Sequence, residues 1–207
     1  MIAKSKLGIF AVVTTSAALV YGASNAQDMT INRASFASGT TLNKPSSDDY
    51  RQWTYIGTPL TPNALNGGEA PFPEFHNVYM ETSAYLHFAK TGEFPDGTQL
   101  AKELVSVRAS DDCDETNGSC FEVSGQGYFQ GEFIGLEMAI KDATLFADEP
   151  GNWAYYSFGH VPPAELAATA EPFPAESCNS CHEASADNDF IFTQFYPVLR
   201  AADPNLK

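Results

Sequence analysis

The chain is poor in positive charge. Lysine and arginine account for 11 of its 207 residues and aspartate and glutamate for 26, so the formal net charge is −15 at neutral pH. So acidic a surface repels nucleic acid and anionic membranes, because both are themselves negatively charged. A cationic or neutral partner fits this charge better, although the same charge is also typical of an acidic protein that binds no macromolecule.

Apolar runs long enough to cross a membrane are missing as well. The one extended run begins at Leu7, ends near Val20 and is shorter than the ~20 residues that a spanning helix requires. A short basic region with Lys4 and Lys6 precedes this run. Two small residues suited to cleavage, Ser24 and Ala26, follow it. This order predicts a secretory signal peptide over residues 1–26 and a periplasmic location. Two basic residues and no acidic ones leave with it, so the mature formal charge is 9 − 26 = −17.

Cysteines are few, and their spacing divides them into two pairs. Cys113 and Cys120 bracket the polar, turn-rich stretch DETNGS, which predicts a local disulfide in an oxidising compartment. Cys178 and Cys181 lie in the stretch ESCNSCHEAS and are followed at once by His182. C-x-x-C-H is the spacing of c-type haem attachment, since two thiols one turn apart add to the haem vinyl groups and the adjacent histidine ligates the iron.

A zinc site or a redox dithiol at this motif lacks support elsewhere in the chain. A zinc site needs a second ligand pair, and the sequence holds no second C-x-x-C. A thioredoxin-like dithiol belongs near a βαβ unit, whereas this motif follows a proline-rich loop close to the C-terminus. The motif could also be a chance match or a plain disulfide. In that case the predicted export, the cysteine spacing and the adjacent histidine would coincide for no physical reason.

Methionine and histidine are absent after His182. The last 207 − 182 = 25 residues contain neither, so the usual downstream sixth iron ligand of a small electron-transfer cytochrome is missing. Upstream side chains could still reach the iron: Met80, Met138, His76, His87 and His160. Because each of these is more often a packed or surface residue, we expect an open sixth position. An open position indicates small-ligand binding or catalysis rather than simple electron relay.

The hydrophobic pattern predicts an α+β fold. Residues 27–46 are polar and are expected to form a flexible lead-in, and residues 47–207 to form a single domain. Strand-like and helix-like runs follow, separated by turn-rich stretches: strands over 76–82, 98–107, 127–141 and 152–159, and helices after Ser46 and over 82–92 and 187–202. Few helices beside several strands with hairpin-like links predict a mainly antiparallel β-sheet with a few short helices, and the haem attachment segment at its C-terminal end.

Two charged residues lie on apolar strand faces. Lys102 shares a face with Leu100 and Leu104, and Glu132 shares the apolar face of the strand over 127–141. Lys102 is either a lysine that reaches solvent or a desolvated amine that acts as a nucleophile. Glu132 is either a structural ion-pair partner, with Lys102 as one candidate, or a proton acceptor in an apolar pocket. Glu137 falls on the opposite face of the same strand.

The chain resembles the cytochrome P-460 family over roughly residues 50–201. The resemblance is carried, in order, by WTYIGTPLTPNALN, FPEFHNVYM, KTGEFPDGTQLAKELVSV, YFQGEFIGLEMAIKD, WAYYSFG and SCNSCHEASADNDFIFTQFYPVLR. It implies a mostly antiparallel α+β fold, usually homodimeric, with a histidine on one side of a c-type haem and an open pocket on the other. In this family a lysine is linked to a haem meso carbon, and hydroxylamine is oxidised. The sister branch, cytochrome c′-beta, lacks the link and binds nitric oxide without this oxidation.

The resemblance assigns the haem attachment residues. Cys178 and Cys181 match the thioethers of one haem c, and His182 matches its iron ligand. The implied activity is oxidation of hydroxylamine, with nitric oxide as a further substrate, to nitrous oxide or nitrite. Electrons would pass to another exported cytochrome or a copper protein, and the acidic surface suits a basic cytochrome. The alternative is a nitric-oxide carrier of the c′-beta kind.

The resemblance also assigns the opposite side of the haem. Lys102 matches the cross-linking lysine, and the rival is Lys90, which lies near a predicted helix end where solvent is expected. Glu132 matches the distal carboxylate that handles protons, and the rival is Glu137, because the Cys113–Cys120 loop makes the offset from Lys102 uncertain.

Overall fold

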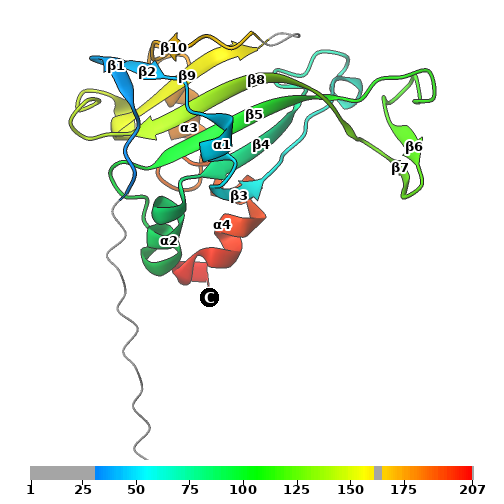
Figure 1. Ribbon diagram of the computed structural model, residues 1–207. Helices are drawn as coiled ribbons and strands as arrows, with labels where there is room; N and C mark the ends of the chain where they lie inside the picture. Colours follow the sequence, from blue (N-terminus) through cyan, green and yellow to red (C-terminus); the bar gives the residue numbers. More distant parts are fainter. Residues whose placement is uncertain (1–30, 161–164, 207) are drawn as a thin grey trace, which may run out of the picture.

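A five-stranded antiparallel sheet forms the centre of the computed structural model, which describes residues 31–160 and 165–206 (Figure 1). The strand order is β3-β4-β5-β8-β9, and every neighbouring pair is antiparallel. The bounds are β3 Thr54–Gly57, β4 Phe75–Met80, β5 Gln99–Val107, β8 Gln130–Lys141 and β9 Trp153–His160. The predicted α+β fold with a mainly antiparallel sheet is confirmed. The signal peptide expected over residues 1–26 lies outside the described residues.

Two smaller sheets flank the central one. One has the order β1-β2-β10, with β1 Phe36–Ser38, β2 Thr41–Asn43 and β10 Thr169–Ala170. The first two strands fall within residues 27–46, where the polar composition predicted a flexible lead-in. Leu42 explains the difference, because its side chain is 1% exposed and packs into the core of the domain. The other sheet is the hairpin of β6 Cys120–Glu122 and β7 Gly125–Gly127.

The four α-helices within the described residues are short, and their ends follow local sequence signals. They are α1 Ser47–Tyr50, α2 Thr82–Thr91, α3 Asn179–Ser185 and α4 Pro197–Ala202. Ser46 caps α1 by accepting a hydrogen bond from the Asp48 backbone N–H, as its residue type predicts. Gly92 ends α2 in the left-handed region at φ 77°, which a glycine adopts without steric cost. No helix among residues 31–160 and 165–206 is long and apolar enough to cross a membrane.

The predicted C-terminal helix over 187–202 is wrong. Residues 188–191 instead form a tight turn, Thr193–Phe195 is a 3-10 helix, and only Pro197–Ala202 is α-helical. Pro197 begins α4 rather than bending or ending a longer helix, because proline lacks only an N–H that the first turn leaves unpaired in any case.

The central sheet is buried on both faces. The face that carries Met80, Leu100 and Tyr155, here called the site face, packs against α2, α4 and the segment around Ile191. The opposite face, here called the back face, packs against the β1-β2-β10 sheet and α1. Its core members are Leu42, Tyr50, Ala101, Leu136, Met138, Ile140, Phe146, Ala154, Tyr156, Phe158 and Ala170. Two separate cores therefore lie on the two sides of one sheet.

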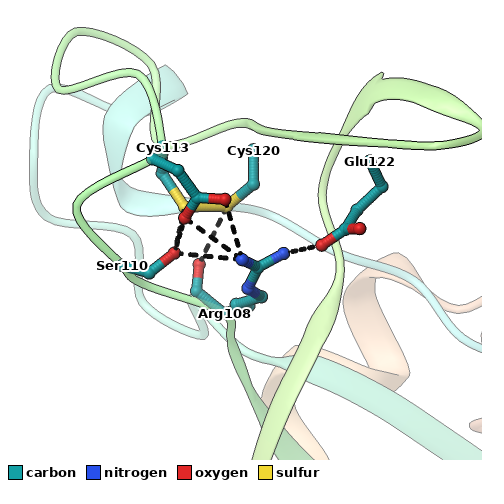
Figure 2. A network of polar contacts seen from close by, with 6 residues as sticks. Arg108, Ser110, Cys113, Cys120 and Glu122 are labelled. Atoms are coloured by element: carbon teal, nitrogen blue, oxygen red, sulfur yellow. Dashed lines mark hydrogen bonds and ion pairs between the residues drawn. A yellow bond between two sulfur atoms is a disulfide. The ribbon is translucent and has the colours of Figure 1, made fainter.

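A long excursion between β5 and β8 ends in the β6–β7 hairpin, which projects from one end of the sheet (Figure 1). We call residues 108–129 the arm. The predicted disulfide between Cys113 and Cys120 is confirmed and closes its base. Figure 2 shows the Arg108 guanidinium beside this bond, in contact with Glu122 and Ser110. Polar contacts and a covalent bond thus stabilise the base of the arm, whose described residues belong to neither core.

Candidate haem site

The C-x-x-C-H motif begins helix α3, which lies against β9. Cys178 is the residue before the first helical turn and Cys181 lies within it, so the two thiols are about one turn apart, and both are free. Asn179, between them, is 1% exposed, and its amide donates to the backbone carbonyls of Trp153 at 2.7 Å and Pro150 at 3.3 Å. No pattern in the sequence marked this residue as part of the site. A single buried amide therefore fixes the position of the motif on the sheet.

His182 is held by one hydrogen bond and two aromatic rings. Its Nδ1 lies 2.7 Å from the carbonyl oxygen of Phe190 and donates to it, which leaves Nε2 as the acceptor nitrogen. The imidazole lies between the rings of Tyr155 and Phe192, with centroid distances of 4.4 Å and 4.7 Å. Burial lowers the pKa of His182, so the ring is neutral at physiological pH. A neutral, oriented imidazole with a free Nε2 is the form that ligates a metal.

The turn that presents the Phe190 carbonyl has an unusual backbone. Asp189 and Phe190 both adopt positive φ values, 42° and 62°, which few residues other than glycine adopt. The Asp189 carboxylate accepts from Lys141 Nζ at 2.6 Å and from the Trp153 indole at 3.3 Å. Gly151 lies directly under the Phe190 ring, where any side chain would overlap it. These contacts stabilise a backbone conformation that the turn would otherwise disfavour.

Lys102 and Glu137 form an ion pair on the site face. They are directly opposite each other in the β5–β8 register, and Lys102 Nζ lies 2.5 Å from the Glu137 carboxylate. Their side chains are 26% and 23% exposed, so the pair is partly desolvated. Lys102 Nζ also lies 5.5 Å from the centroid of the Phe72 ring.

The ion pair lies close to the motif. Burial raises the pKa of the Cys178 thiol, and the charges of Glu137 and Lys102 also act on it, in opposite directions. The same two charges act on His182, after the larger effects of burial and the Phe190 hydrogen bond. Lys102 therefore lies within electrostatic range of Cys178 and His182, and so does Glu137. Lys90, the rival to Lys102, is exposed near the end of α2.

Glu132 does not join this group. Its side chain is exposed, and its backbone N–H donates to Ser106 Oγ. Strict alternation of residues along the strand predicted that Glu132 lies on the inner face. That count fails because the β5–β8 register is irregular between Leu104 and Val105 and again before Val107. The apolar face of β8 is also the back face, so the carboxylate beside Lys102 is Glu137.

The candidate sixth ligands occupy several different places. Met138 packs in the back-face core, and Met80 is fully buried in the site-face core. His87 is exposed on α2, whereas His76 and His160 both contact Glu74 on the site face.

The donor set fits a c-type haem. Two free thiols one turn apart and a neutral histidine with a free Nε2 are the groups that such a haem requires. No group of three or more His, Cys, Asp or Glu side chains suited to a metal ion occurs within the part of the chain that the structure describes. The two thiols and the imidazole thus fit the attachment and ligation chemistry of a c-type haem.

Comparison with known proteins agrees with this geometry. The family model for cytochrome P460 matches residues 47–193. No match was found among curated protein sequences. A c-type haem cofactor and oxidoreductase-type chemistry accompany the matched family. With most of its length matched by the family model, the chain belongs to the cytochrome P460 family.

Proposed function

We propose that this protein is an exported cytochrome that oxidises hydroxylamine at one c-type haem, attached through Cys178 and Cys181 and ligated by His182. The observation that carries the proposal is the Lys102–Glu137 ion pair, 2.5 Å long, on the same sheet face as the motif. A lysine that only reached for solvent would not be partly buried beside both a carboxylate and a haem attachment motif.

The haem, when bound, supplies the redox chemistry of the iron, and the protein supplies position and proton transfer. Oxidation of two hydroxylamine molecules to one nitrous oxide and one water releases four protons and four electrons. The electrons go to an external acceptor, for which an exported basic cytochrome or a copper protein suits the acidic chain. The protons need a base on the side of the haem away from His182, and we assign Glu137 to this role in place of Glu132.

Lys102 is the residue that we assign to the additional haem link. Its amine must lose a proton to become a nucleophile, and Glu137 lies within hydrogen-bond distance to accept it. Formation of the carbon–nitrogen bond removes one hydrogen from each partner, so an external two-electron oxidant such as a peroxide is also required.

An absorption spectrum of the reduced protein tests the link. We expect the displaced, red-shifted main band of the family in the parent protein and its loss in Lys102→Ala. Lys90→Ala is the matched control, because Lys90 is exposed, and it should keep the band. Survival of the band in Lys102→Ala would show that Lys102 is the wrong lysine.

A second pair of variants tests the proton acceptor. Glu137→Gln should still bind hydroxylamine but turn it over about 100-fold more slowly, the typical contribution of general acid–base catalysis. Glu132→Gln, the same change on the same strand at an exposed position, should have no effect. The assignment fails if Glu132→Gln is slow and Glu137→Gln is not.

The aromatic ring of Phe72 beside Lys102 favours one alternative, a nitric-oxide carrier of the c′-beta kind with an aromatic cap over its open site. An ordinary five-coordinate spectrum without the displaced band, together with tight nitric oxide binding, would identify the carrier. A six-coordinate, low-spin spectrum would reject both functions.

We also propose that the mature protein begins after Ala26, is periplasmic and forms a homodimer. Mass spectrometry of the protein from the periplasmic fraction checks the cleavage site, and light scattering of the holoprotein checks the dimer. Retention of residues 1–26 or a monomeric mass would contradict these proposals.

A further inference from the structure

Two histidines on the site face share one buried carboxylate oxygen. Glu74 is 3% exposed, and its Oε1 lies 3.3 Å from Nε2 of His76 and 3.3 Å from Nε2 of His160. The two imidazoles differ in exposure: the His76 side chain is 14% exposed and the His160 side chain 41%. The three groups therefore form a chain with an inner histidine, a bridging carboxylate and an outer histidine.

This chain is one step along the sheet from the Lys102–Glu137 ion pair. His76 pairs with Leu104 on β5, and Leu104 is two residues from Lys102, so both side chains are on the same face. The Phe72 ring spans the two positions, because its centroid lies 6.0 Å from that of His76 and 5.5 Å from Lys102 Nζ. The inner histidine thus lies on the same sheet face as the ion pair to which we assign proton transfer, with Phe72 near both.

Gly135 permits the outer histidine to approach. Gly135, on β8, pairs with Leu104 of β5 on one side and with His160 of β9 on the other. A Cβ at this position would lie 2.5 Å from the Gly159 carbonyl oxygen and 3.1 Å from the His160 Cα. Only glycine therefore allows β9 to lie close enough for His160 to reach across to Glu74.

Glu74 also borders a cavity of about 490 Å³ between the sheet and the base of the arm. The ionisable groups that line this cavity with Glu74 are Arg108, Asp114, Glu115 and Tyr128. In the direction away from the arm, the next charged groups on the site face of β5 and β8 are Lys102 and Glu137. The carboxylate consequently lies between the ion pair and a space large enough for several water molecules.

We propose that His76, Glu74 and His160 form a proton relay that carries protons from the open side of the haem to solvent. The inference rests on the proposed hydroxylamine oxidation, which releases those protons. His76 accepts a proton at Nδ1 and passes the one on Nε2 to Glu74 Oε1. Glu74 passes it to His160 Nε2, and His160 releases the proton on its Nδ1 to water, so each group regains its initial charge.

The resting charge of Glu74 suits a bridge. Burial by itself raises the pKa of Glu74, but the hydrogen bond from His76, a backbone hydrogen bond and the charges of both histidines together lower it. Glu74 is therefore ionised between the two rings and is ready to accept a proton from His76. These are positioning and relay residues, since no contact with substrate is shown.

Cyanide binding to the ferric holoprotein tests the relay without hydroxylamine turnover. Hydrogen cyanide is protonated in neutral solution and must lose its proton on binding, so a nearby proton acceptor accelerates association. Stopped-flow rates from pH 5 to pH 9 should fall about 10- to 100-fold in His76→Gln and Glu74→Gln near neutral pH. The pH dependence of the rate should flatten in both variants. His87→Gln, the same change at an exposed histidine on α2, is the matched control and should be unaffected.

A variant of the outer histidine tests the relay if His76→Gln and Glu74→Gln do not fold. His160→Gln changes a side chain that is 41% exposed, and it should slow cyanide association at least severalfold. Unchanged rates and pH profiles in His76→Gln, or in His160→Gln where the buried variants fail, overturn the relay. A protein that binds cyanide with this histidine dependence but does not oxidise hydroxylamine would refute the proposed function and leave the relay intact.

Discussion

Replacement of Gly151 by alanine tests how the structure orients the proposed iron ligand. Gly151 adopts φ 65°, and a Cβ there would overlap the Phe190 ring, with even the third-nearest ring carbon only 3.0 Å away. An alanine in the left-handed region costs about 1–2 kcal/mol. Overpacking against a ring adds about 1–3 kcal/mol. Gly151→Ala should therefore lower the free energy of unfolding by roughly 2–5 kcal/mol.

Gly67→Ala separates the two contributions. Gly67 has nearly the same backbone angle, φ 69°, but among the described residues no atom lies within 4 Å of the point that its Cβ would occupy. This control should lose only about 1–2 kcal/mol, the backbone part, when both variants are unfolded with urea. The change in unfolded-chain entropy is the same for both replacements and cancels from the comparison.

The same variant carries a second readout at the haem. Displacement of the Phe190 ring should move its carbonyl away from His182 Nδ1, and loss of that hydrogen bond makes Nε2 a weaker donor to iron. The iron–histidine stretching frequency should therefore fall in Gly151→Ala and stay constant in Gly67→Ala. Equal unfolding free energies and equal frequencies in the two variants would refute the reasoning.

Three further predictions concern parts of the fold that differ in their distance from the haem. Asn179→Ala should lower the unfolding free energy by about 1–3 kcal/mol and reduce haem incorporation, whereas Ser180→Ala, its exposed neighbour in the motif, should do neither. Replacement of Cys113 and Cys120 by serine opens a loop with a sequence separation of only 7 and should cost about 2.4 kcal/mol in unfolding free energy, with an unchanged haem spectrum. Glu103→Leu removes a buried carboxylate of the back face and should lower the melting temperature while the haem spectrum again stays constant.

Local sequence signals were sufficient for the elements with strong end signals. The helix that ends at Gly92 and strands β4, β5, β8 and β9 of the central sheet were predictable because glycine and the spacing of apolar residues determine them locally, whereas β3 was not among the predicted strands. The cysteine pairs were predictable for the same reason. The turn at Asp189 and Phe190 was not, since the apolar residues around it are also compatible with one helical face. The Asn188–Asp189 dipeptide, a common turn pair, was the signal that could have indicated it.

The residues to which we assign proton transfer could not be derived from one strand at a time. Alternation along β8 correctly identifies its apolar face, but both faces of this sheet are buried, so apolarity does not distinguish the site face from the back face. Glu103 illustrates the problem, because it points to the side opposite Lys102 and is nevertheless 4% exposed and bonded to Tyr50 and Arg51. Only the pairing between β5 and β8 places Glu137 beside Lys102.

The irregular pairing at the outer end of β5 and β8 bears on how this protein can change. From Gln99 to Leu104 the two strands keep an unbroken register, and both interruptions lie between that stretch and the arm. A change in the length of the arm can be absorbed where the register already shifts, so it does not move Lys102 to the other face. The arm is consequently a natural insertion site. A foreign peptide placed between β6 and β7 should be displayed on the protein without altering the colour of its haem.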